Sequence, residues 1–223
     1  MIEIAGVIAA LILGIIGGNG AVYVFNHMPP QWLCDYGEEP MEDKLQRQRI
    51  NSRPWKALFS VLLVAGGVKL AAVDFLFALP VMAVIWLLIL LSIADIKYMI
   101  IPDQVVIALA VCAVGFVNYH DNPLDMLYGA LCGGGVMMVM ALAGWLISKK
   151  EAMGFGDVKL MAALGFISGL KGIIVIIIGM SVISAMAFTV MIAMKRIKRT
   201  DSKPLGPYIS AAATIYMLVI WQL

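Results

Sequence analysis

The stretch from Phe75 to Ala94, FLFALPVMAVIWLLILLSIA, carries no charge and is followed directly by Asp95. A helix of this length can cross the hydrocarbon core of a bilayer, which is about 30 Å thick. Comparable apolar runs recur along the chain, at roughly 4–25, 57–73, 75–94, 101–119, 126–147, 157–170, 172–194 and 205–222. The sequence therefore predicts an all-α fold, a polytopic membrane helix bundle with about eight transmembrane helices.

The overall composition agrees with a membrane protein. Of the 223 residues, 62% are hydrophobic and 13% are charged, and the mean hydropathy of +0.96 lies far outside the range of a soluble domain. The small net charge of +2 gives no indication of a nucleic-acid partner. Residues 2–25 begin with Glu3 and lack the basic segment of a signal peptide, so we expect this first helix to be retained. Residues 1–223 are thus expected to form a single membrane domain.

One polar segment of appreciable size, residues 26–56, separates the first two apolar runs. It mixes acids, bases and prolines, and it is too small and too charged for a core of its own. It is either a solvated cytoplasmic loop with one short helix near Met41–Arg49, or a cap that contacts the substrate.

The distribution of basic residues predicts how the bundle is oriented. With eight helices, 14 of the 16 Lys and Arg residues fall on one face or its flanks, and Lys69 and Lys171 fall on the other. The positive-inside rule then places the basic face in the cytoplasm and both termini outside, as expected for the inner membrane of a cell. Asp95 and Asp157 both lie at cytoplasmic helix ends, and hence at one depth.

A carboxylate at the edge of a bilayer is costly unless water, a partner or a function accounts for it. Asp157 follows two glycines in Gly154-Phe155-Gly156-Asp157, and glycines allow a bound chain to approach closely. Two facing carboxylates share one proton, so that one acts as acid and the other as base, as in the aspartic proteases. The alternative is that each is an ordinary helix-end carboxylate in water.

The residues around these two acids resemble the type IV prepilin peptidases, which are polytopic aspartyl proteases with a G-x-G-D signature. Residues 151–165, EAMGFGDVKLMAALG, are similar to the second catalytic motif of that family, and residues 94–103, ADIKYMIIPD, are similar to the first. Residues 125–135 and 204–209 extend the resemblance. It implies that Asp95 and Asp157 are catalytic and that Asp103 is not. The resemblance and the local chemistry give these residues supporting or substrate-binding roles: Gly154, Gly156, Lys97, Pro102, Asp103, Glu151 and Lys159.

Several of these supporting residues have two interpretations. Lys159 either extends to lipid phosphates or holds a neighbouring acid, and Lys97 has the same alternatives. Glu151 either binds a basic leader or is an ordinary surface acid. The glycines from Gly129 to Gly135 are interpreted as a close helix-packing face.

The resemblance implies a substrate and a location for the cut. The substrate is a prepilin or pseudopilin precursor, whose short basic leader is removed at the cytoplasmic face without a cofactor. Many bacterial members carry two C-x-x-C pairs in the first loop, a region associated with methyl transfer from S-adenosylmethionine. Here Cys34 stands alone and neither Cys112 nor Cys132 completes a pair, so no metal site is predicted and methyl transfer is in doubt. The sequence gives no oligomeric state.

Three other classes of protein remain as alternatives. Intramembrane acids also mark the proton pathways of ion-coupled transporters, but coupling carboxylates are expected near mid-membrane and often in repeated halves. A presenilin-like protease shares G-x-G-D, but it would have Tyr where Ala94 precedes Asp95 and would carry a Pro-Ala-Leu motif. A purely structural bundle leaves the two acids unexplained.

Overall fold

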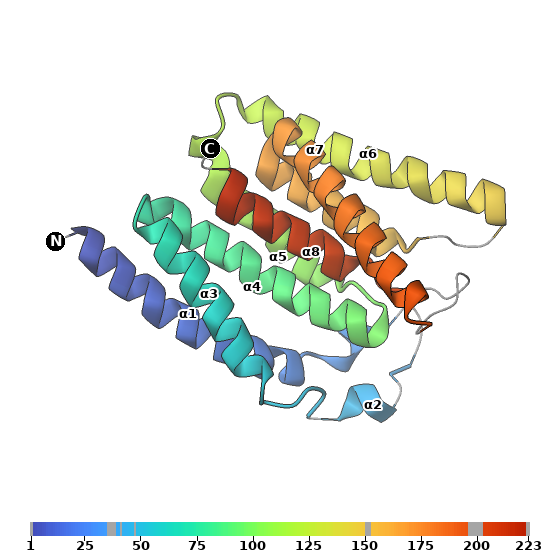
Figure 1. Cartoon of the computed structure of the whole chain (residues 1–223), viewed down its shortest axis with the longest axis horizontal. Helices are drawn as coiled ribbons and strands as arrows, with labels where there is room; N and C mark the ends of the chain where they lie inside the picture. The colour runs from blue at the N-terminus through green and yellow to red at the C-terminus, as the bar shows by residue number, and fades with distance from the viewer. Residues whose placement is uncertain are drawn as a thin grey trace.

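The structure, a computed structural model, describes residues 2–34, 39–40, 42–46, 48–149, 153–195 and 203–221. Within these ranges the chain is helical and contains no β-strand, which confirms the predicted all-α class (Figure 1). The elements in chain order are α1 (Ile2–His27), η1 (Pro30–Leu33), α2 (Glu42–Leu45), α3 (Trp55–Ala71), α4 (Phe75–Tyr98), α5 (Asp103–Val111), η2 (Cys112–Tyr119), α6 (Pro123–Ser148), α7 (Phe155–Ala193), α8 (Gly206–Ile215) and η3 (Tyr216–Ile220).

Four of the described helices are long and apolar enough to cross a membrane. They cover Ile4–His27, Phe75–Tyr98, Pro123–Ile147 and Phe155–Ala193, and α4 is the most buried of them. The remaining predicted runs form shorter helices, namely α3, α5 with η2, and α8 with η3. The polytopic bundle is therefore supported, whereas the number of about eight crossings stays a prediction.

Helix α7 contains two arms that meet at Gly169. This residue has φ 70° and ψ −179°, a left-handed region that favours glycine, and it interrupts the helix. A straight helix would separate Met161 from Ile173 by about 18 Å, yet both lie beside Gly133 of α6. The chain thus folds back at Gly169, and both ends of α7 lie on one side of the bundle (Figure 1). The two arms correspond to the predicted runs 157–170 and 172–194.

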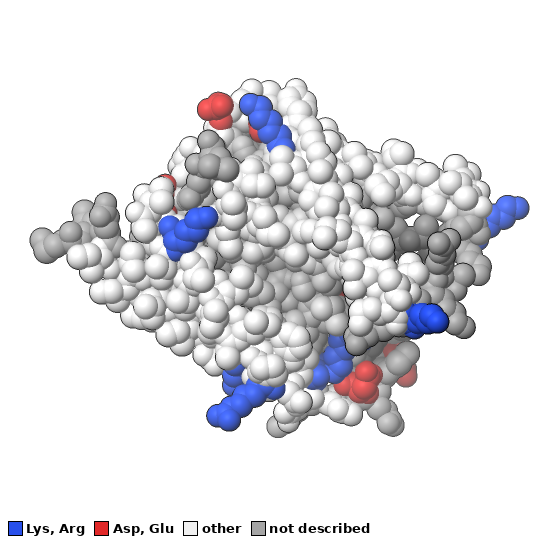
Figure 2. Space-filling view, in the orientation of Figure 1, with Lys and Arg blue, Asp and Glu red and all other residues white. Residues whose placement is uncertain are grey.

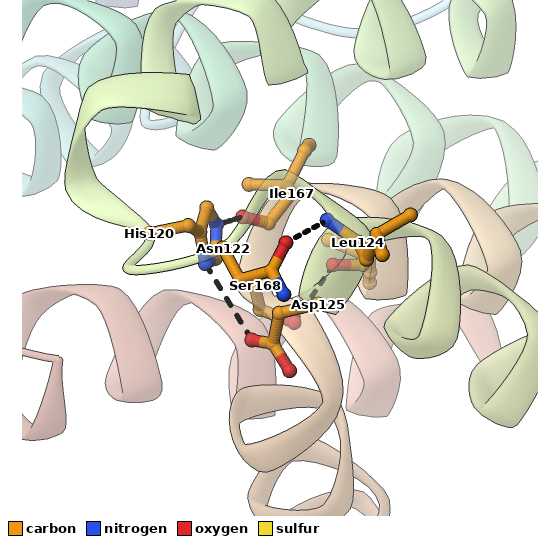
Figure 3. Close-up of polar contacts among 7 residues, drawn as sticks. His120, Asn122, Leu124, Asp125, Ile167 and Ser168 are labelled. Carbon is orange, nitrogen blue, oxygen red and sulfur yellow. Dashed lines mark hydrogen bonds and ion pairs between the residues drawn. The ribbon is translucent and has the colours of Figure 1, made fainter.

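The reversal in α7 is closed by a histidine (Figure 3). The break leaves the carbonyl of Ile167 without its helical partner, and the Nε2–H of His120 donates to this carbonyl oxygen at 2.9 Å. The side chain of His120 is only 6% exposed, and its Nδ1 lies 3.7 Å from Oδ2 of Asp125 in the first turn of α6. His120 therefore joins the start of α6 to the break in α7.

Glycines bring α6 and the first arm of α7 into backbone contact. A Cβ atom on Gly129 would overlap the carbonyl oxygen of Gly165, and a Cβ on Gly165 would overlap the backbone of Gly129 in return. Gly133 is similarly close to the backbone of Met161. The predicted packing role of this glycine stretch is confirmed for these positions, whereas Gly135 faces open space.

Charged side chains lie at the ends of the bundle. In Figure 2, most of the visible Lys and Arg side chains gather along the lower and right-hand margins, at the end opposite the two chain termini, and uncharged side chains cover the surface between. Lys69 lies at the other end, where its Nζ donates to the carbonyl of Leu218 at 2.6 Å. This arrangement agrees with the predicted asymmetry of the basic residues.

Candidate active site

Asp95 lies in the last turn of α4, where the helix ends. Met99 closes the helix in a left-handed conformation with φ 53°, and its N–H donates to the carbonyl of Asp95 at 2.9 Å. The carboxylate itself is 5% exposed, and its Oδ2 accepts a hydrogen bond from the backbone N–H of Gly206 at 2.7 Å. Asp95 is thus held by the first residue of α8.

Asp157 lies in the first turn of α7. Gly154 is the N-cap residue, with φ −69° and ψ 142°, and its carbonyl accepts from the N–H of Asp157 at 3.2 Å. The aspartate is 8% exposed, and its Oδ1 is buried without a hydrogen-bond partner among the described residues. Such an atom is costly unless it carries or receives a proton during function.

The fold brings these two acids together. Helix α8 packs against both α4 and α7, and the negative charge of Asp95 acts on Asp157. Sixty-two positions of sequence separate the two residues, so tertiary structure alone creates the pair. Like charges in a buried site resist simultaneous ionisation, which is the condition for sharing one proton.

The glycines of the G-x-G-D stretch have different surroundings. A Cβ atom on Gly156 would lie 2.8 Å from Cβ of Ile101, so this glycine lets the start of α7 pack against the segment after α4. Pro102 in that segment is buried and precedes α5. Gly154 meets nothing within 4 Å, so packing does not explain a glycine there.

Lys159 and Asp103 form an ion pair beside the site. The Nζ of Lys159 lies 2.8 Å from both carboxylate oxygens of Asp103 and 5.2 Å from the ring centroid of Phe155. Of the two interpretations of Lys159, the structure therefore supports contact with a neighbouring acid. The pair joins the first turn of α5 to the first turns of α7.

The segment between α1 and α3 reaches the end of α4. Lys97, two residues after Asp95, donates to the backbone carbonyl of Arg49. Arg49 is 7% exposed and donates through Nη1 to the carbonyl of Phe25 at 2.9 Å. Lys97 is thus engaged with the polar loop, and part of that loop lies next to the candidate site. Glu151 lies outside the described residues.

Asn26 fastens this loop to α1. Its Oδ1 accepts from the N–H groups of Arg49 and Ile50, both at 2.9 Å, and its Nδ2 donates to the carbonyl of Ile50 at 3.1 Å. A single side chain therefore satisfies three backbone groups. These contacts position the loop beside Lys97.

We expect Asn26→Ala to release the loop. Three hydrogen bonds worth about 1 kcal/mol each are lost. Trypsin cleavage of the Arg49–Ile50 bond, whose two N–H groups Asn26 holds, should therefore accelerate at least about tenfold when opening of the loop precedes cleavage. Limited proteolysis followed by mass spectrometry measures this rate. Asn19→Ala is the matched control, because Asn19 lies on the same helix and its amide donates to the carbonyl of Ile15 in that helix. Equal cleavage of the two variants would contradict the anchoring role.

The contact from Gly206 was not predicted as part of the site. The stretch Pro204-Leu205-Gly206-Pro207 is part of the family resemblance, but no function was predicted for any of its residues. Every residue except proline has a backbone N–H, so the sequence alone does not indicate which one donates to a site. The one available signal was a glycine in a short segment bounded by Pro204 and Pro207. Among the described residues, no group of three His, Cys, Asp or Glu side chains is arranged to hold a metal ion.

Fold and site together define a class: a polytopic helical membrane protein in which two buried aspartates from separate helices interact electrostatically at one end of the bundle. Residues 82–190, which include both aspartates, match the model described as "Type IV leader peptidase family". This match confirms the predicted resemblance of the region around both aspartates to that family.

Individual relatives agree with this assignment. The chain is 35% identical over 132 residues to a "Prepilin leader peptidase/N-methyltransferase" of Xanthomonas campestris pv. campestris, covering 57% of this chain and 45% of the relative. It is 30% identical over 139 residues to the protein of the same name from Aeromonas hydrophila, covering 60% and 47%. The chain thus spans about half the length of these relatives. No solved structure matches the chain.

Proposed function

We propose that this protein is an aspartic endopeptidase of the inner membrane that removes the short basic leader of a prepilin or pseudopilin precursor. The observation that carries the proposal is the meeting of two buried carboxylates, Asp95 and Asp157, from helices distant in sequence. The relatives named prepilin leader peptidases support the choice of substrate. The match to this family also favours a peptidase over a transporter.

The chemistry follows from one proton shared by two acids. The ionised aspartate accepts a proton from water as the water oxygen attacks the carbonyl carbon of the scissile bond, and the protonated aspartate donates to the carbonyl oxygen. When the carbon–nitrogen bond breaks, the first acid returns its proton to the departing amine. The second acid recovers its proton from the hydroxyl that becomes the new carboxyl group. Neither a metal nor a cofactor takes part.

The orientation of the chain fits a cut at the cytoplasmic face. With about eight crossings, the basic residues and the ends of the helices that carry both aspartates lie on the same side, which the positive-inside rule assigns to the cytoplasm. A precursor whose apolar helix stays in the bilayer then presents its leader at the depth of the carboxylates.

The supporting residues divide into two groups in this proposal. Gly156, Pro102 and the Lys159–Asp103 pair hold the turns around the aspartates, as their contacts indicate. The loop 26–56 and Lys97 form a cytoplasmic surface on which the leader docks, together with Gly154 and Glu151. We do not extend the proposal to methyl transfer from S-adenosylmethionine, because Cys34 alone replaces the paired cysteines associated with it.

Purified protein in detergent, incubated with a candidate prepilin and analysed by mass spectrometry, tests the proposal. We expect cleavage on the carboxyl side of the basic leader and no dependence on added metal. Parallel reactions with and without S-adenosylmethionine show whether the new amino terminus also gains a methyl group of about 14 Da. An intact precursor after incubation with folded, lipid-supplemented protein would overturn the assignment.

A further inference from the structure

The two aspartates differ in what holds them. Oδ2 of Asp95 accepts from the Gly206 N–H at 2.7 Å, at the short end of the range of charge-assisted bonds, and this bond is buried. Oδ1 of Asp157 has no hydrogen-bond donor among the described residues although it is equally shielded from water. A donor favours a charged carboxylate, and the lack of one favours a carboxyl group that keeps its proton.

The donor belongs to the beginning of a helix. Gly206 is the first residue of α8, so its N–H has no partner within that helix and lies at the positive end of the helix dipole. Pro204, two residues earlier, and Pro207, the next residue, have no N–H to offer, and Pro207 suits the first turn of a helix. The turn therefore directs one of its few amides at Asp95.

No side chain fits between this amide and the carboxylate. A Cβ atom on residue 206 would lie 2.7 Å from Oδ2 and 3.2 Å from Cγ of Asp95. Any residue larger than glycine would displace the carboxylate or the start of α8. Residue 206 thus supplies the N–H that donates to Asp95, and its lack of a side chain lets the carboxylate come close enough to accept. The hydrogen bond needs both properties.

We propose, building on the proposed peptidase function, that the Gly206 N–H is a positioning group that assigns the roles of the two acids. It holds Asp95 as the carboxylate that accepts the proton of the attacking water. Asp157 carries the shared proton, donates it to the carbonyl oxygen and recovers it when the carbon–nitrogen bond breaks. Asp95 passes the proton it accepted to the departing amine, so both acids end as they began.

Nuclear magnetic resonance of protein labelled with ¹⁵N-glycine tests this assignment without any cleavage assay. The Gly206 resonance is identified by its loss in Gly206→Ala, and Gly135 serves as a reference because it faces open space on α6. We expect the Gly206 amide proton to move upfield as acid protonates Asp95, and to lose this response in Asp95→Asn. A Gly206 resonance that ignores pH, or that titrates equally in Asp95→Asn, would overturn the proposal.

Asp157→Asn tests which acid is charged. Asp157 is the ionisable group of α7 that interacts electrostatically with the charge of Asp95. Lys97 on α4 is engaged with the carbonyl of Arg49, and α8 contributes the Gly206 amide. If Asp157 is the protonated partner, its replacement leaves the midpoint of the Gly206 titration unchanged. A fall of about one pH unit or more would mean that Asp95 ionises against a charged Asp157, and the roles would be reversed.

Kinetics of Gly206→Ala provide the second measurement. A displacement of the carboxylate by about 1 Å should lower kcat roughly 100-fold with little change in KM. Gly135→Ala is the matched control and should retain the wild-type kcat. Wild-type kcat in folded Gly206→Ala would contradict the positioning role. If that variant fails to fold, triple-resonance backbone assignment of the wild-type protein identifies the Gly206 amide, and its titration still decides.

Discussion

Asp95→Asn and Asp157→Asn should each abolish processing of a prepilin, with a loss of about 10³-fold or more. Asparagine has nearly the same shape as aspartate, but it neither accepts the proton of water nor donates one to a carbonyl. Because the two acids act as a pair, removing one ends the shared-proton chemistry and does not merely weaken it. Mass spectrometry of the products, at equal concentrations of purified enzyme, measures the loss.

The control for this result is an acid remote from the pair. Asp121 is exposed and adjoins His120 at the break in α7, so Asp121→Asn should process the substrate at the wild-type rate. Membrane abundance and thermal unfolding of the aspartate variants should match the wild type. Processing at an undiminished rate by either variant, free of contaminating wild-type enzyme, would refute the proposed mechanism.

Gly129→Ala should cause a large loss of stability. Its new Cβ would overlap the carbonyl oxygen of Gly165, and neither backbone can move without separating α6 from α7. Overpacking of this kind costs about 1–3 kcal/mol, and close approach of backbones is what small residues provide at membrane helix interfaces. Thermal unfolding in detergent should therefore occur at a clearly lower temperature.

Gly135→Ala separates packing from helix propensity. Gly135 lies on α6 as Gly129 does, but a Cβ there meets nothing within 4 Å. Alanine is favoured over glycine in a helix by about 1 kcal/mol, so this variant should be as stable as the wild type or slightly more so. Equal destabilisation of the two variants would show that backbone contact between α6 and α7 is not what the glycines provide.

The helices could be predicted closely because a bilayer restricts backbone conformation so strongly. Lipid offers no hydrogen-bond partners, so an apolar run of sufficient length becomes a helix almost irrespective of its neighbours. The run 75–94 accordingly corresponds to α4, and the separate runs 157–170 and 172–194 correspond to the two arms of α7. The sequence did not predict that the break lies at Gly169. Several glycines lie close together in this stretch, and any of them could interrupt a helix, but Gly169 is the one with φ 70°.

The sequence predicted those parts of the site that depend on the type of side chain, and it did not predict those that depend on backbone groups. The depth of Asp95 and Asp157 followed from the distribution of basic residues, and their pairing followed from the cost of two lone acids at that depth. The Gly206 amide and the loop anchor Asn26 act through backbone groups, and contacts of that kind depend on a tertiary arrangement that no local pattern encodes. Lys159 had two interpretations until the position of Asp103 was known.

The fold-back at Gly169 also has a consequence for the surrounding lipid. The first arm of α7, from Phe155 to Ser168, is roughly 21 Å long at 1.5 Å per residue, whereas the hydrocarbon layer is about 30 Å thick. Such a hydrophobic mismatch is relieved when the bilayer becomes locally thinner. We therefore expect headgroups and their hydration to descend beside Asp157, so that the water consumed in hydrolysis has only a short distance to travel.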